Sequence, residues 1–87
     1  MKILLPLLFL LVSVAPTLAQ SSSFLALLEK AKNGNVDAQN EVGIAYSEGK
    51  GVKPDQRMAV YWFRKSAEQG YAIGTSNLAL HYSMGWG

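Results

Sequence analysis

Apolar positions recur every three or four residues from residue 24 onward, which is the spacing of one face of an α-helix. This pattern predicts four helices, over residues 24–33, 38–48, 56–69 and 74–84. The third predicted helix carries the largest apolar surface, because Trp62 and Phe63 lie on its apolar face. The pattern therefore predicts an all-α fold.

Glycine and aspartate mark the expected ends of these helices. Gly34, Gly49 and Gly70 follow the first three predicted helices, and glycine enters the left-handed conformation that commonly ends a helix. Asp37 and Asp55 precede the second and third predicted helices, where a carboxylate accepts a hydrogen bond from a free backbone N–H. Between the second and third helices, the glycines and proline of residues 49–54 predict a tight turn.

The same residues return at a period of 36 positions. Ala31 recurs as Ala67, Gly34 as Gly70, Tyr46 as Tyr82, Ser47 as Ser83 and Gly49 as Gly85. A fixed period in the thirties with two helices in each unit is typical of an α-solenoid. We therefore expect a short α-solenoid of antiparallel helix pairs.

The stretch from residue 38 to residue 70 resembles the Sel1-like repeat, a relative of the tetratricopeptide repeat. The residues that carry this resemblance are Ala38, Val42, Gly43, Tyr46, Gly49, Gly51, Val52, Asp55, Ala59, Trp62, Phe63, Lys65, Ala67, Glu68, Gln69 and Gly70. The resemblance implies a stacked helix-turn-helix array that binds other proteins. It divides residues 24–87 into a capping helix (24–33), a full repeat (37–70) and a half repeat (73–87). Within the full repeat, we expect Gly43 to admit the second helix closely and Trp62 to be buried.

Residues 1–19 have the layout of a secretory signal peptide. Lys2 supplies the positive start, an apolar run follows, and Ala19 is the small residue at the expected cleavage site. The alternative is an uncleaved membrane anchor, but the run is short of the roughly 20 apolar residues that a spanning helix needs. The expected product begins with a polar linker, residues 20–23, has no stable membrane span, and is secreted or periplasmic.

The charge balance gives little indication of a partner. The formal net charge is +2, and removal of Lys2 with the leader lowers it to +1. No basic stripe with interleaved aromatic residues is present, so we expect no nucleic-acid binding. The absence of cysteine excludes a disulfide.

The residues that usually carry catalysis are sparse. His81 is the single histidine, and no cysteine is present to complete a nucleophile pair or a metal site. We expect His81 to be half-buried or solvated, and the carboxylates to be solvated on helix surfaces or to cap helices. The sequence therefore predicts no catalytic residues, no metal and no cofactor, and a protein that is not an enzyme.

The face of the first helix of each repeat that points away from the second helix is the expected binding surface. At 100° per residue, six side chains lie there, two aliphatic and four polar. They are Asn40, Ile44, Ser47, Ser76, Leu80 and Ser83. The related tetratricopeptide family uses the matching positions to bind ligands, which supports a protein or peptide partner at this face. The alternative is that these are ordinary exposed side chains.

The last helix departs from the pattern. Ile73 and Gly74 replace the aspartate and alanine that begin the preceding repeat, so we expect Thr75 or Ser76 to cap a later start. The helix that would complete this repeat is not in the sequence, which leaves an apolar stripe of Leu78, Tyr82 and Trp86 and predicts self-association. Two functions remain open: an exported adaptor or regulator that binds a partner, or a self-associating structural protein or part of a longer array with no dedicated ligand.

Overall fold

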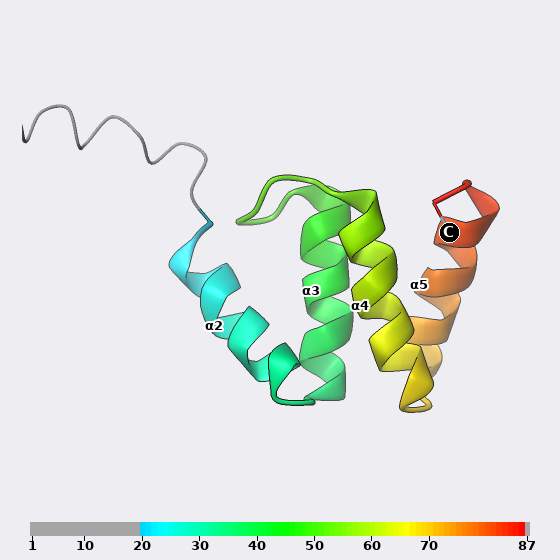
Figure 1. Ribbon diagram of the computed structural model, residues 1–87, viewed down its shortest axis with the longest axis horizontal. Coiled ribbons are helices and arrows are strands. Elements are labelled where there is room, and N and C mark those ends of the chain that lie inside the picture. Colours follow the sequence, from blue (N-terminus) through cyan, green and yellow to red (C-terminus); the bar gives the residue numbers. More distant parts are fainter. Residues whose placement is uncertain (1–19, 87) are drawn as a thin grey trace, which may run out of the picture.

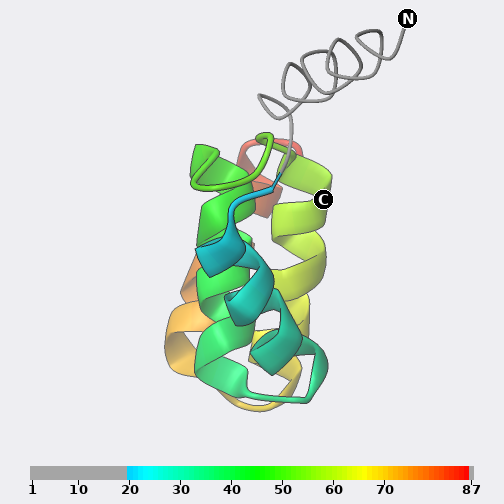
Figure 2. The same ribbon diagram turned by 90° about the vertical axis from the view of Figure 1, so that its left-hand side faces the viewer.

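Four helices make up the part of the chain that the computed structural model describes, residues 20–86. They are α2 (Ser22–Lys32), α3 (Val36–Glu48), α4 (Gln56–Glu68) and α5 (Ala72–Ser83). Each helix packs on the next in chain order (Figure 1). Seen from the side, α3 and α5 form one layer and α4 lies across from them (Figure 2). The predicted all-α, solenoid-like fold is confirmed, whereas the expected leader, residues 1–19, lies outside the described residues.

Polar side chains begin the first three helices. Ser21 accepts a hydrogen bond from the backbone N–H of Phe24 and thereby begins α2. Asp55 caps α4 as predicted, through a 3.1 Å bond from the N–H of Met58. The prediction that Asp37 caps α3 is wrong. Asn35 is the cap, with its Oδ1 2.8 Å from the N–H of Ala38, and Asp37 instead lies in the first turn, where negative charge suits the helix dipole.

The prediction of a late start for α5 is also wrong. The helix begins at Ala72, and among the described residues no side chain caps it; the Thr75 hydroxyl donates instead to the Tyr71 carbonyl at 3.2 Å. Gly74 explains how this first turn packs. A Cβ at Gly74 would lie 2.6 Å from the Ser66 hydroxyl oxygen and 2.8 Å from its Cβ. The glycine therefore lets α5 approach α4 closely.

The core lies along both sides of α3. Val42, Ala59 and Phe63 are essentially inaccessible, and the other buried hydrophobic residues are Phe24, Ala31, Ala38, Ala45, Val60 and Trp62. Trp62 is 7% exposed, which confirms its predicted burial. Gly43 faces the Phe63 ring, and a Cβ there would lie 2.5 Å from a ring carbon. The prediction that this glycine admits α4 closely is therefore confirmed.

The 36-residue period is visible in the helix boundaries. Helix α5 begins 36 residues after α3, and α2 ends 36 residues before α4. Helices α3 and α5 are thus equivalent, and we call each the first helix of a repeat. Helices α2 and α4 are likewise the second helices. Within residues 20–86, α2 has no first helix before it and α5 has no second helix after it.

Candidate functional site

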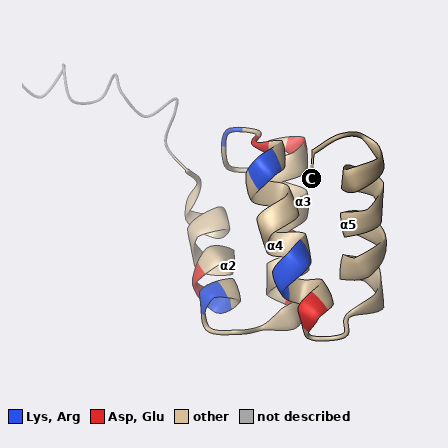
Figure 3. Ribbon diagram, turned by 45° about the vertical axis from the view of Figure 1, so that its right-hand side comes forward, with Lys and Arg blue, Asp and Glu red and all other residues tan. Residues whose placement is uncertain are grey.

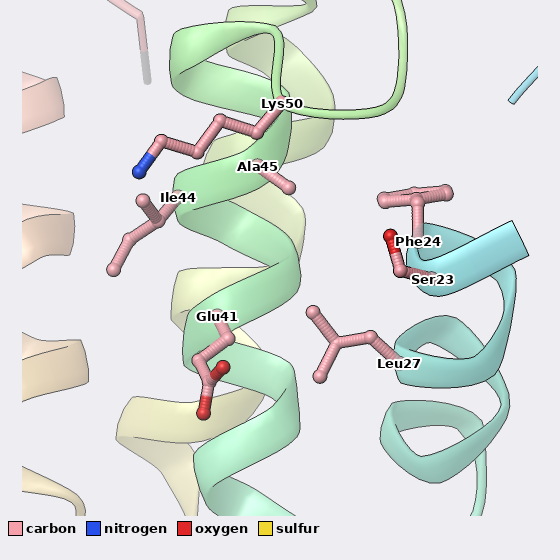
Figure 4. A pocket seen from close by; sticks show the side chains of 7 residues that line it. All are labelled: Ser23, Phe24, Leu27, Glu41, Ile44, Ala45 and Lys50. Carbon is pink, nitrogen blue, oxygen red and sulfur yellow. The ribbon is translucent and has the colours of Figure 1, made fainter. Parts of the chain in front are cut away.

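An open groove of about 490 Å³ runs between α2 and α3. Figure 4 shows the side chains that line it, which come from both helices and from the loop after α3. They are Ser23, Phe24, Leu27, Glu41, Ile44, Ala45 and Lys50.

The groove has an apolar base and a polar rim. Phe24 and Ala45 are buried at its base, and Leu27 and Ile44 are half-buried beside them. Glu41 and Lys50, with Ser23, are exposed and form the rim; Lys50 also pairs with Glu48 at 3.1 Å. An apolar base with a charged rim is the kind of surface that binds the apolar face of an amphipathic helix.

The repeat frame shows what this groove corresponds to. One repeat later, α3 occupies the equivalent space beside α4 and α5. It packs Gly43 on Phe63 of α4 and places Asn40 and Ser47 against α5. The residues on α4 and α5 that meet α3 there include Phe63, Asn77 and His81. Their equivalents 36 residues earlier are Leu27, Glu41 and Ala45, all of which line the groove. The groove is therefore the place that a preceding first helix would occupy.

Two of the predicted partner-binding residues lie instead between α3 and α5. The Asn40 side chain is 5% exposed, and its Oδ1 accepts a 2.9 Å hydrogen bond from the Asn77 amide. The Ser47 hydroxyl lies 3.2 Å from Nε2 of His81. Both side chains hold two first helices together, so the structure removes them from the open surface.

The other four predicted residues lie in two places. Ile44 is half-buried and lines the groove. Ser76, Leu80 and Ser83 are exposed on α5, with Leu80 54% exposed, and the Ser83 hydroxyl donates to the Leu80 carbonyl at 2.7 Å. The predicted surface is therefore divided between the groove and the far side of α5.

The residues predicted for self-association are also divided. Leu78 is half-buried, whereas Tyr82 is 44% exposed and accepts a hydrogen bond from the Arg64 guanidinium of α4. Trp86 is exposed beyond the end of the helix. The open side of α5 carries small residues instead: Ala72, Ser76, Ala79 and Ser83. Figure 3 shows that α5 carries no Lys, Arg, Asp or Glu.

His81 is buried, 5% exposed, which corrects the expectation of a half-buried or solvated side chain. Its Nδ1 donates to the Asn77 carbonyl at 3.1 Å, and its Nε2 lies 3.1 Å from Oε1 of Gln56. The ring also packs edge-on against Phe63, with centroids 5.1 Å apart. These contacts join α5 to α4, so His81 has a structural role.

A polar pair joins the beginning of α5 to α3. The Asp37 carboxylate raises the pKa of Tyr71, chiefly through a hydrogen bond to the phenol, with desolvation and the charges of Asp37 and Glu41 adding to the effect. A carboxylate accepts this bond only from the protonated phenol. The pair therefore strengthens the α3–α5 contact below the pKa of the phenol.

The indole N–H of Trp62 is buried and has no hydrogen-bond partner among the described residues. A hollow of about 170 Å³ adjoins the Trp62 side chain and is lined on its polar side by Lys32, Lys65 and Gln39. An unpaired buried donor costs roughly 1–3 kcal/mol.

Neither a metal site nor a membrane-spanning helix is present in residues 20–86. That stretch holds no group of three or more His, Cys, Asp or Glu side chains able to bind a metal ion together. It also contains no helix with the length and hydropathy needed to cross a bilayer.

Comparison with known proteins agrees with this geometry. Residues 36–71 match the family model of the Sel1 repeat. The chain is 37% identical over 54 residues to a sel1-like repeat-containing protein of Acanthamoeba polyphaga mimivirus. That alignment covers 62% of this chain and 10% of the relative, so the chain spans about a tenth of the relative's length. No solved structure gives a significant match. The matched segment contains α3, α4 and the loops that end them, and this helix pair is therefore similar to a Sel1 repeat.

Proposed function

We propose that this chain is an exported protein-interaction module whose α2–α3 groove binds a helix of a protein partner. The single observation that carries the proposal is that the groove is equivalent to the place that α3 occupies one repeat later. Its lining residues Leu27, Glu41 and Ala45 are the equivalents of the residues that hold α3 in place one repeat later. A surface that is built to pack a helix within the array is suited to pack a helix from another protein.

The chemistry of the groove limits the kind of helix that fits. The half-buried Leu27 and Ile44 offer apolar surface, and burying such a side chain fully is worth roughly 1.5–3 kcal/mol. Glu41 and Lys50 stand at the rim with opposite charges, so neither strongly acidic nor strongly basic helices are favoured. We expect a partner helix with small or aliphatic residues on its buried face and few charges.

Export is the second part of the proposal. It is supported by the layout of residues 1–19, with its basic start, apolar run and small residue at Ala19. An exported interaction module acts as an adaptor or regulator in a secreted or periplasmic location. The alternative kept from the sequence is a structural protein, or a portion of a longer array, that has no dedicated partner.

Photo-crosslinking in the producing cell tests both parts. A photoreactive phenylalanine analogue replaces Glu41, which is exposed at the rim of the groove, and in a control chain it replaces Arg57, which is exposed on α4. Intact masses are then measured on the exported protein. We expect a discrete protein adduct from position 41, little from position 57, and a chain that lacks residues 1–19.

Two outcomes would overturn the proposal. If position 41 gives no protein adduct, or gives the same adducts as position 57, the groove is not a binding site. If the protein retains residues 1–19 and stays inside the cell, the export part fails, whatever the groove binds.

A further inference from the structure

We propose that the partner helix is α5 of a second copy of this chain, so that copies join head to tail and the solenoid continues across the junction. This inference rests on the proposed function, because it names the occupant of the same groove. It starts from the two ends of the described array. Within residues 20–86, no first helix precedes the second helix α2, and no second helix follows the first helix α5.

The surface of α5 that would enter the groove can be identified from α3. The side of α3 that packs on α4 contains Gln39, Gly43 and Ser47. Gln39 accepts a hydrogen bond from the Gln69 amide, and Gly43 contacts the Phe63 ring. The Ser47 carbonyl accepts a hydrogen bond from the Gln56 amide. The equivalents on α5 are Thr75, Ala79 and Ser83, which are all exposed. The side of α5 that corresponds to an established helix contact is therefore uncovered in a single copy.

The central steric contact is compensated at this junction. Within the full repeat Gly43 meets Phe63, and a methyl group on the glycine would lie 2.5 Å from the ring. Across the junction Ala79 would meet Leu27 of the other copy. The added methyl group of alanine faces a side chain that is smaller than phenylalanine. The two changes offset one another, so a helix pair can pack at a similar distance.

Hydrogen-bond donors are also retained. In the full repeat, two side chains of α4 and the side chain of Gln69, which follows it, donate to backbone carbonyls in or just before α3. These bonds run from Gln56 to Ser47, from Ser66 to Val36 and from Gln69 to Gly34, at 2.9, 3.3 and 3.1 Å. Their equivalents at the N-terminal end are Gln20, Lys30 and Asn33. All three of these side chains carry N–H donors, so a second copy can offer the same kind of bond to the carbonyls of Ser83, Ala72 and Gly70.

The contact between first helices changes in a complementary way. Asn40 and Asn77 form it within one copy, and the equivalent pair across the junction is Ser76 with Glu41. A serine hydroxyl donates to a carboxylate, and such charge-assisted bonds are stronger than neutral ones. Because α5 carries no Lys, Arg, Asp or Glu, no like charge opposes Glu41 or Lys50 (Figure 3).

The open side of α5 is also less polar than the outer face of a capping helix. Terminal helices of repeat arrays usually present a polar outer face, which keeps the array from stacking further. The open side of α5 holds two alanines and two serines, next to Leu80, which is 54% exposed. Each copy thus has one donor surface and one acceptor surface, which defines a heterologous contact.

Two complementary variants of the exported protein test the junction. Ala79→Arg blocks the open side of α5 and leaves the groove intact. Ser23→Arg blocks the groove and leaves α5 intact, because the equivalent of Ser23 in the full repeat is Ala59, which is completely buried against the neighbouring helix. Both residues are exposed in a single copy, so both variants should fold, and circular dichroism checks this.

Sedimentation velocity over a range of concentrations then gives the result. We expect the wild-type mass to rise with concentration, each variant to stay monomeric, and an equimolar mixture to form a dimer and nothing larger. A mixture that stays monomeric, or one variant that still associates alone, would overturn the head-to-tail contact. A wild type that is monomeric at every concentration would also overturn it. In that case a groove-specific adduct with a different protein, or with residues 1–19 of the same chain, would leave the groove as a helix-binding site.

Discussion

At the scale of single residues, two glycines inside helices set the distances between helices. Gly43 allows contact with Phe63, and Gly74 allows contact with Ser66. A glycine in a helix interior costs about 1 kcal/mol relative to alanine, so each is retained for close packing. The sequence indicated the role of Gly43 but not that of Gly74. Gly43 belongs to the repeat pattern, whereas Gly74 looks like the loss of a helix-favouring alanine.

Gly43→Leu should lower the free energy of unfolding by roughly 1–3 kcal/mol, because the new side chain overpacks the contact with Phe63. Urea unfolding measures the change. The matched control is Ala79→Leu, which places the same side chain at the equivalent position on the exposed side of α5. Measured at a concentration where the protein is monomeric, the control should change little. Equal effects of the two substitutions would contradict the close approach of α3 and α4.

The residues whose roles were mispredicted depend on contacts distant in the chain. The burial of His81 requires Gln56 and Phe63, and the burial of Asn40 requires Asn77. No local pattern reports such partners. The capping error at α3 is different, since two suitable caps, at positions 35 and 37, precede the same helix. In the structure Asn35 is the cap, and Asp37 lies in the first turn.

At the scale of helices, the number of elements followed from apolar periodicity, and most ends followed from glycine and capping residues. Gly49 ends α3 in the left-handed conformation with φ 75°, as expected. The beginning of α5 did not follow from local signals. It is held by tertiary contacts such as the packing of Gly74 on Ser66. A propensity argument does not include these contacts.

The Tyr71–Asp37 bond predicts an alkaline loss of stability. The pKa of Tyr71 is raised in the folded state above its ordinary value of 10.0. The bond therefore stabilises the fold fully below pH 10.0 and loses its effect as the pH rises through the folded pKa. Tyr71→Phe removes it, so the melting temperature of the wild type should exceed that of the variant at pH 8, and the difference should shrink by pH 11.

Thermal melts of both proteins at several pH values check this expectation. The other tyrosines titrate in both proteins, so their effect cancels in the difference between the two melting temperatures. A difference that stays constant from pH 8 to pH 11, or grows with pH, would show that Tyr71 acts through packing of its ring and not through its hydroxyl.

At the scale of the whole molecule, the 36-residue period accounts for the arrangement of the four helices. The period identifies α2 as a second helix, so the groove beside it is the place that a preceding first helix would occupy. The lining of the groove could not be predicted from the sequence in the same way. Leu27 and Lys50 come from separate parts of the chain, and only the packing angle of α2 on α3 brings them to one surface.

Two residues expected on the binding surface, Asn40 and Ser47, lie at the contact between α3 and α5. Helical geometry placed both opposite Val42 and Tyr46 on their own helix. Stacking of the next repeat then covers them with Asn77 and His81. In a solenoid, the open surface is therefore defined by the stacking of repeats as much as by the faces of each helix.

The measurement that tests the central claim most directly is an NMR titration of the groove with a helix equivalent to α5. The exported Ala79→Arg protein serves as the receptor, because its own α5 is blocked and its groove is open. The ligand is a synthetic peptide of residues 70–86, and the control is the same peptide with Ala79→Arg. We predict saturable shifts of the backbone amides of Ser23, Leu27, Glu41 and Ile44 with the first peptide only. Shifts confined to α4 and α5, or equal shifts with both peptides, would contradict the binding of α5 in the groove.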